Sequence, residues 1–553
     1  MNTIPQPQLV LGYKEFFKVS PPLDRLSLVS GVCKRNLIAE LAGLNYRLKP
    51  KTSKYHDTSL ENQIKELKYF CGIDDGLYQR YSKVADYYTV NKNDYPLIFI
   101  RQTCIYALEE IIQSDLAVIE DFKMARVEVW DSIFKYILAV NTSITEIEKA
   151  ENDDLINFET LNPKMLPLNE LNISADPIYT PYRGYRLLEY LSKNEEVKDE
   201  LVKYFESTYS VTYDYFVYET LGMYLANKSE NSLFDFYYIV TSRSTGLFEK
   251  LSQVHKSTDI PKLLSIKKYP FYKGKENTYI LTDNTLLLEK TYTQFINDFW
   301  FDWIKKLTSP DGKSKINIKK YKSIIGYFFE SYVRETIQYS FSKAKHYTIK
   351  LFEDLKIAKK GGVVELADLY IRDNTKIILG QVKATSIYDN EKYGGSIDTF
   401  YKNDRNKFFD SFGVDQLVSS IMQLDDDMPK IDANFPSNKA YRVYPIIIVN
   451  EKALQTPLMG KIFQDRFLEL MKEYKNPKTH IFPLSIIHVG DLESIQDYLF
   501  GKYKEVWDLL KFHCRNPHFM PPFYNSINRK DIRPNYERSM VLYEVLIAKH
   551  NTT

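Results

Sequence analysis

The chain changes character at one break, Ser309-Pro310-Asp311-Gly312, and this change constrains its fold more than any other feature. A proline and a glycine so close together end a regular element. Before the break, apolar residues recur three and four positions apart, as they do in helices. After it, apolar runs of strand length alternate with helical segments. We therefore predict a multidomain chain with a mostly helical N-terminal half and a C-terminal α/β domain.

The length of 553 residues agrees with several domains of roughly 100–200 residues each. Prolines interrupt the stretch after residue 151, which predicts an extended linker or strap. A later stretch predicts a β-hairpin, because Tyr279–Leu281 and Leu286–Leu288 flank polar residues. The predicted domains are a helical domain over 1–150, a Pro-containing linker or strap over 151–185, a helical domain with a hairpin over 186–310, and the α/β domain over 311–553.

The composition excludes some classes of protein. With 74 Lys+Arg against 72 Asp+Glu, the net charge is only +2, so the chain is not a polybasic, tail-like binder. Its 4 cysteines are too few and too scattered for a disulfide framework or a four-thiolate zinc site, which favours a cytoplasmic protein. The longest apolar runs fall far short of the about 20 residues that span a bilayer, so we expect no membrane partner.

The α/β part contains the pattern that points to chemistry. Residues 363–371 and 376–385 read as two strands joined by a tight turn. A turn centred on residues 373 and 374 places Asp368 opposite Leu379. Because side chains alternate between the two faces of a strand, the register decides which polar groups meet.

In this register Asp368, Gln381 and Lys383 share one face, while Glu365 points to the other face unless a bulge intervenes. A carboxylate, an amide and an ammonium group on one face of an apolar hairpin are costly to bury without a ligand. A hard cation is such a ligand. Asp368, the Gln381 amide oxygen and the Val382 carbonyl form a plausible partial shell for Mg²⁺. Lys383 would then orient or deprotonate a water molecule, or neutralise a phosphate.

The predicted helix before this hairpin adds a fourth group. Gly326, Glu330, Val333 and Ile337 follow the spacing of one helix face, which places Glu330 on a largely apolar stripe. An acid in such a position needs a partner, and a metal-bound water is one candidate.

Together these residues resemble the PD-(D/E)XK nuclease superfamily, over roughly Lys322 to Val449. The resemblance implies a restriction-endonuclease-like domain with a central mixed sheet flanked by helices, and a Mg²⁺- or Mn²⁺-dependent phosphodiesterase. The residues that it assigns to catalysis are Glu330, Asp368, Gln381 and Lys383, with Asp368, Gln381, Val382 and Glu330 at the metal. Gln381 stands where most members have an acid, which lowers the expected metal affinity and disfavours a second metal.

Further residues are candidates for contact with nucleic acid. The stretch from Asp311 to Lys350 carries a local excess of positive charge, which suits a phosphate backbone. A later segment is similar to a glutamine-bearing helix seen in several branches of the superfamily. The candidates are Lys319, Lys320, Lys322, Lys359, Lys360 and Gln416.

We therefore expect a cytoplasmic endonuclease that cleaves DNA, of the kind found in bacterial restriction or antiphage defence. Two alternatives stay open: an RNA-cleaving nuclease, and a non-catalytic nucleic-acid-binding or scaffold protein of the same fold. The sequence also leaves open a homo-oligomer or a partner protein from a defence system. It contains no phosphate-binding loop of the Gly-x-x-x-x-Gly-Lys type, so an ATP-driven step would need another protein.

Overall fold

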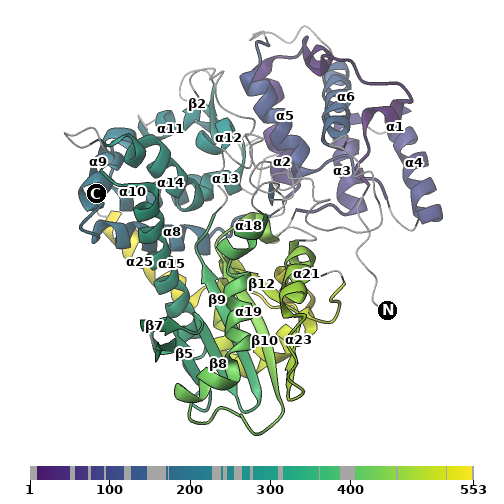
Figure 1. The fold of residues 1–553 in the computed structure, drawn as a ribbon. Coiled ribbons are helices and arrows are strands. Elements are labelled where there is room, and N and C mark those ends of the chain that lie inside the picture. Colours follow the sequence, from purple (N-terminus) through teal and green to yellow (C-terminus); the bar gives the residue numbers. More distant parts are fainter. Residues whose placement is uncertain are drawn as a thin grey trace. The chain divides into compact units, whose positions relative to one another are not determined.

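The computed structural model (Figure 1) describes residues 9–49, 56–71, 76–92, 95–116, 126–145, 170–171, 173–226, 238–240, 246–253, 264–274, 278–308, 315–359, 362–386, 405–455, 459–518 and 520–550. Within these ranges the chain divides into two compact units. The first contains the described parts of Met1–Lys149, Leu171–Trp303 and Leu546–Thr553, and the second contains those of Ala150–Glu170 and Ile304–Val545.

The first unit consists mainly of helices, as the sequence predicts. In α2 and α5, buried leucines and isoleucines recur three and four positions apart, and these stripes pack the two helices against each other. The helices are α1 (Tyr13–Phe17), α2 (Lys34–Arg47), α3 (Leu60–Cys71), α4 (Gly76–Lys92), α5 (Arg101–Gln113), α6 (Arg126–Thr145), α8 (Tyr179–Ser192), α9 (Lys198–Tyr209), α10 (Tyr213–Ala226), α11 (Gly246–Lys250), α12 (Leu264–Lys268), α13 (Asn284–Glu289) and α14 (Thr293–Asp298).

A small sheet in this unit corrects the first predicted hairpin. Its strand order is β1 (Tyr238–Val240), β4 (Thr278–Leu281), β3 (Phe271–Lys273) and β2 (Ser252–Gln253). The run 286–288 is therefore not the second arm of a hairpin but part of α13. The reason is local: the Asp283 side chain accepts a hydrogen bond from the Leu286 N–H and so caps a helix start.

The predicted strap is wrong over its last residues. Residues 151–169 lie outside the described part of the chain, but α8 begins at Tyr179, before the expected end at 185. Pro181 lies in the first turn of α8, where a missing N–H breaks no helical hydrogen bond.

The second unit is built around a mixed six-stranded sheet (Figure 1). Along the main path its order is β11 (Thr479–Ile481), β10 (Tyr441–Val449), β9 (Lys376–Lys383), β8 (Leu369–Asp373) and β5 (Thr348–Leu351), and β12 (Ser485–His488) also pairs with β10. The pairs β5–β8 and β8–β9 are antiparallel, whereas β9, β11 and β12 run parallel to β10. The strand β10 is almost entirely buried and reads as a continuous apolar run, as expected for an inner parallel strand.

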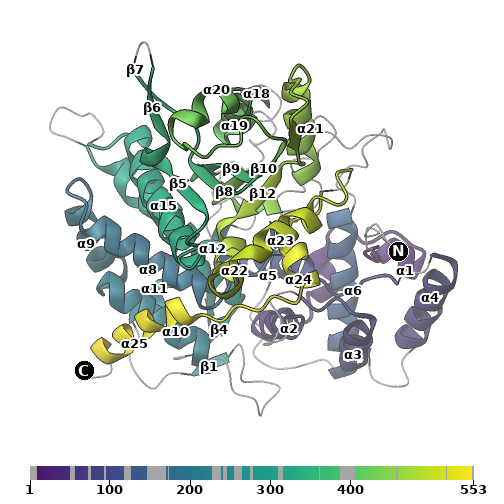
Figure 2. The ribbon, with the colours of Figure 1, turned by 90° about the horizontal axis from the view of Figure 1, so that it is seen from below.

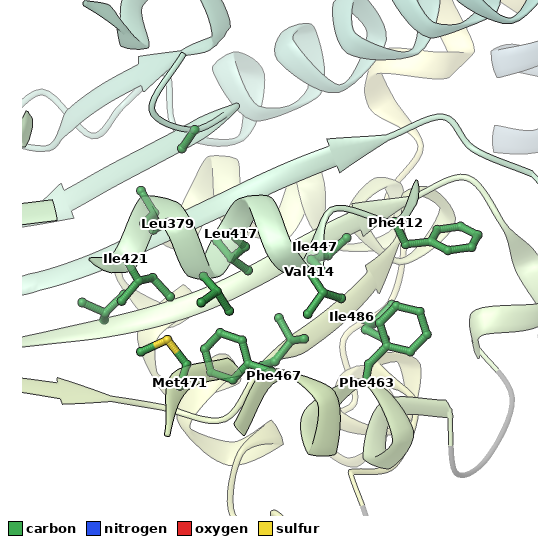
Figure 3. Packing of buried hydrophobic residues seen from close by; sticks show 14 of the residues in the cluster. Leu379, Phe412, Val414, Leu417, Ile421, Ile447, Phe463, Phe467, Met471 and Ile486 are labelled. Atoms are coloured by element: carbon green, nitrogen blue, oxygen red, sulfur yellow. The ribbon is translucent and has the colours of Figure 1, made fainter. Parts of the chain in front are cut away.

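Helices cover both faces of this sheet (Figure 2). On one face, α19 (Val414–Met422) and α21 (Met459–Met471) close the main core of the unit. Figure 3 shows Leu379 and Ile447 of the sheet beside Leu417 and Ile421 of α19. On the other face lie α15 (Ile318–Ser340) and α22 (Val489–Lys502), which pack along each other. This arrangement confirms the predicted α/β part with a mixed sheet and flanking helices.

The remaining elements of this unit complete the surroundings of the sheet. A separate two-stranded ribbon, β6 (Lys356–Lys359) and β7 (Gly362–Glu365), precedes β8. The other helices are α18 (Arg405–Ser411), α20 (Leu424–Asp427), α23 (Val506–His513), α24 (Phe523–Arg529) and α25 (Glu537–His550), of which the last continues into the first unit. Within the described ranges, every helix is too short or too polar to cross a lipid bilayer.

Candidate active site

The β8–β9 hairpin has a different register from the predicted one but keeps the predicted faces. Asp373 pairs with Lys376 around a tight turn, in which Asn374 has a φ of 55°. Leu369 therefore pairs with Gly380, so that Asp368 lies level with Gln381 rather than Leu379. The shift is two positions, and an even shift leaves each side chain on its own face.

Asp368 is held by the backbone of both strands. Its N–H donates to the Gly380 carbonyl at 3.0 Å. Its Oδ2 accepts from the Val382 N–H at 2.7 Å and from Lys383 Nζ at 3.5 Å. The residue is 8% exposed, and its Oδ1 makes no hydrogen bond with any described residue. The carboxylate is thus fixed in place with one oxygen still able to bind a ligand.

Two further oxygens lie beside this carboxylate. Gln381 is only 4% exposed, yet its side-chain amide has no hydrogen-bond partner among the described residues. Because neither amide atom is fully shielded from solvent, the amide faces an open cleft and is able to bind a ligand there. The Val382 N–H points toward Asp368, and the carbonyl of a strand residue points to the same side as its N–H. The Val382 carbonyl therefore points to the side of Asp368, but Val382 is not among the residues that line this cleft.

The start of α19 supports the end of β9. Gly413, the N-cap residue of α19, has a φ of +81°, a backbone conformation that residues other than glycine rarely adopt. A Cβ atom here would lie 2.5 Å from Lys383 Cε and 3.2 Å from Gln381 Cβ. Glycine thus allows the loop before α19 to pack directly on these two side chains.

Glu330 reaches the same site from α15. The Asn317 side chain caps this helix by accepting a hydrogen bond from the Lys320 N–H. Val333 and Ile337, on the same stripe as Glu330, are buried, and Glu330 itself is partly exposed. Burial and, to a lesser extent, the charges of Asp368 and Glu365 raise the pKa of Glu330 to about 7.

These groups line one cleft of about 550 Å³, a size suited to a small ligand or a short polymer segment. Its α19 wall is the polar side of that helix and includes Gln416, which the sequence singled out. The lining residues are Glu330, Val364, Glu365, Leu366, Asp368, Gln381, Lys383, Asp410, Asp415, Gln416, Ser419, Ser420 and Gln423. Among them Lys383 is the one basic residue, so carboxylates dominate the charge of the cleft.

Glu365 is the main residue that the sequence prediction misplaced. The prediction treated 363–371 as one strand, which sends Glu365 to the opposite face. In the structure β7 ends at Glu365, and the chain bends at Asp368 before β8 begins. This interruption brings Glu365 to the cleft beside Asp368. The sequence prediction allowed for this outcome, because it placed Glu365 on the opposite face only if no bulge interrupts the strand.

The sequence prediction also missed four other residues that line the cleft. These are Asp410, Asp415, Ser419 and Ser420, of which the last three share the polar side of α19 with Gln416.

Among the described residues, the lysines predicted to contact nucleic acid do not line the cleft. Lys319, Lys320 and Lys322 are exposed on the first turns of α15. Lys359 donates to Asp427 Oδ2 at 2.5 Å and to Gln423 Oε1 at 2.9 Å, which ties the β6–β7 ribbon to the end of α19. Its charge is thus already paired with a carboxylate. Lys360 lies outside the described residues.

The raised pKa of Glu330 has a consequence for stability in the absence of metal. A carboxyl group with a raised folded-state pKa stabilises the fold below its ordinary pKa of 4.5, and this contribution is lost as the pH rises through about 7. We expect Glu330→Gln to make the fold more stable than wild type at about pH 8, by about 1 kcal/mol after allowance for the partial exposure. At about pH 4 the two proteins should be nearly equal. Urea denaturation in EDTA measures this, and a difference that does not change with pH would contradict it.

In the part of the chain that the structure describes, no three His, Cys, Asp or Glu side chains are grouped closely enough to hold a metal ion by themselves. No protein-family model, no curated protein and no solved structure matches this chain.

Proposed function

We propose that the second unit has a restriction-endonuclease-like fold and that the chain is a metal-dependent endonuclease acting on DNA. One observation carries this proposal. One cleft contains four functional groups from two elements. Helix α15 contributes the acid of Glu330, and the hairpin contributes the fixed Asp368 carboxylate, the Gln381 amide and the Lys383 ammonium group. This combination suits the hydrolysis of a phosphodiester bond. A role in bacterial restriction or antiphage defence is part of the proposal and follows from the resemblance.

The donor chemistry of the cleft fits a hard cation. Asp368 Oδ1 and the Gln381 amide oxygen have no partner among the described residues, and the Val382 carbonyl points to the same side. These oxygens would hold Mg²⁺ or Mn²⁺, which binds one or two carboxylates together with neutral oxygens and waters. When bound, the cation stabilises negative charge on a phosphate and lowers the pKa of a bound water.

Two side chains of the cleft have roles of their own. Lys383 donates to Asp368 and is partly exposed to the cleft, so its ammonium group stabilises the charge that develops on the phosphate oxygens. Glu330, with a pKa near 7, exchanges a proton near neutral pH and accepts one from an attacking water. Asp368 keeps Lys383 in position through their shared hydrogen bond.

A panel of substrates tests this function. The purified chain would be incubated with supercoiled plasmid, linear duplex DNA, single-stranded DNA and RNA, with Mg²⁺, Mn²⁺ or EDTA. We expect cleavage of DNA in either metal and none in EDTA. Cleavage of RNA alone would support the RNA-cleaving alternative, and binding without any cleavage would support the non-catalytic one.

The contact between Gly413 and Lys383 gives a second prediction. Gly413→Ala introduces a Cβ at 2.5 Å from Lys383 Cε at a φ of +81°, so either the loop or the lysine must move. We expect a loss of stability of about 1–2 kcal/mol and a cleavage rate lower by about ten-fold or more. The control is Gly501→Ala on α22, where a Cβ meets no atom within 4 Å. Equal rates for the two variants would show that Lys383 does not depend on this packing.

A further inference from the structure

The cleft lacks a carboxylate at Gln381 but gains one from a neighbouring element. Glu365 is the last residue of β7, and the next two residues, Leu366 and Ala367, are buried at 6% and 0% exposure. This buried pair anchors the backbone between Glu365 and Asp368. Glu365, itself exposed, therefore lines the cleft from a fixed point, three residues before the carboxylate that the two strands hold in place.

The lysine opposite Glu365 in the β6–β7 ribbon forms no ion pair with it. Lys356 is its direct partner across the β6–β7 ribbon, where opposite charges often form a cross-strand pair. Among the described residues, Glu365 forms no ion pair with Lys356 or with any other residue, and its side chain makes no hydrogen bond. Burial and then the charge of Asp368 raise the pKa of Glu365, while the charges of Lys356 and Lys383 lower it to a lesser extent. Two carboxylates that repel each other in one cleft gain stability when a cation lies between them.

The other added acids of the cleft are less suited to this role. Asp415 already forms an ion pair with Arg466 Nη2 at 3.3 Å. Asp410 is exposed like Glu365, but it lies near the end of α18, far from Asp368 along the chain. Glu365 is close to Asp368 along the chain, and the unpaired Gln381 amide lies level with Asp368 on the adjacent strand. The three groups thus offer two carboxylate oxygens and one neutral oxygen to a single cation.

We propose that Glu365 is a second carboxylate ligand of the divalent cation and supplies the negative charge that Gln381 does not. The inference rests on the proposed metal-dependent function and extends it. A Gln-x-Lys strand then does not imply a weak metal site, because the missing charge is supplied from β7. One set of carboxylates, Asp368 with Glu365, holds the cation, while Glu330 remains available for proton transfer.

Direct measurement of metal binding tests this assignment. The affinity of the full-length chain for Mn²⁺ would be measured by calorimetry or electron paramagnetic resonance at about pH 8, where the carboxylates are ionised. We expect Glu365→Gln to weaken binding by about ten-fold, because affinity at such sites follows the charge of the ligands. The double variant Glu365→Gln/Gln381→Glu should regain most of the wild-type affinity. The matched control, Glu353→Gln, removes an acid that pairs with Arg334 and does not line the cleft.

Each outcome decides the assignment. Wild-type affinity in Glu365→Gln overturns it, as does a double variant that binds no better than the single one, or a wild-type chain that binds no Mn²⁺. A chain whose Mn²⁺ affinity depends on Glu365 but which cleaves no nucleic acid contradicts the endonuclease function and leaves the ligand assignment standing. Cleavage of DNA with full metal affinity in Glu365→Gln contradicts the ligand assignment alone.

Discussion

Replacement of Lys383 by methionine should lower the rate of DNA cleavage by about a hundred- to a thousand-fold, the loss expected for a donor that stabilises charge in the transition state. Methionine keeps the volume of the aliphatic stem, which packs against Gly413, but removes the ammonium group. Binding of Mn²⁺ should survive, because Lys383 is not a ligand. The variant thus separates the chemical role of the lysine from the metal site.

Single-turnover cleavage of an end-labelled duplex measures this effect. The matched control is Lys376→Met at the other end of β9, where the lysine lies over the Trp507 ring at 5.6 Å and away from the cleft. We expect the control to cleave at the wild-type rate. A Lys383→Met variant as active as the control would show that the ammonium group takes no part in the reaction.

The largest expected effect on stability lies in the first unit. Asp283 accepts hydrogen bonds from Arg101 Nη2 at 2.7 Å, Arg101 Nε at 3.0 Å and Asn45 Nδ2 at 2.7 Å, and it also caps α13. The Arg101 side chain is 1% exposed. Asp283→Ala leaves this guanidinium group buried without its counterion, and breaking such a pair costs about 3–5 kcal/mol.

Hydrogen–deuterium exchange of peptides from α5 and α13 checks this prediction locally. We expect both peptides to exchange much faster in Asp283→Ala than in wild type, since local opening becomes easier. Asp131→Ala is the control, because its ion pair with Lys135 is a partly exposed pair within one helix. Equal protection in the two variants would mean that the buried pair contributes little to the stability of this unit.

The sequence was sufficient for those features of the site that depend on alternation. Asp368, Gln381 and Lys383 were predicted to share a face, and all three line the cleft. The register itself was predicted two positions away from the one found, because the turn type was not determined by the residues around Asn374. An error of two positions leaves each side chain on its own face, so the predicted faces are correct although the predicted register is not.

The sequence was not sufficient where the backbone departs from a regular element. Glu365 was assigned to the opposite face because the break between β7 and β8 leaves no mark in the apolar pattern of 363–371. The run 286–288 was read as a strand, although the Asp283 cap makes it a helix. In both places a local feature of the backbone, a bend in one case and a helix cap in the other, decides the structure against the apolar pattern.

The ion pairs between residues far apart in the chain could not be predicted from the sequence either. Lys359 was a candidate for phosphate contact, but its ammonium group is paired with Asp427, a residue far along the chain. Glu335 on α15 likewise forms an ion pair with a distant residue, Arg538, whose Nη2 lies 3.0 Å away. Such partners depend on the packing of distant elements, which no local pattern specifies.

The central claim is that Asp368 organises a metal-dependent site that cuts DNA. The most direct measurement compares wild type with Asp368→Ala, purified identically, on supercoiled plasmid with Mg²⁺ and with EDTA. We expect wild type to nick or linearise the plasmid only with Mg²⁺, and Asp368→Ala to leave it supercoiled in both. Equal cleavage by the two proteins would contradict the claim, because it would place the activity outside this cleft.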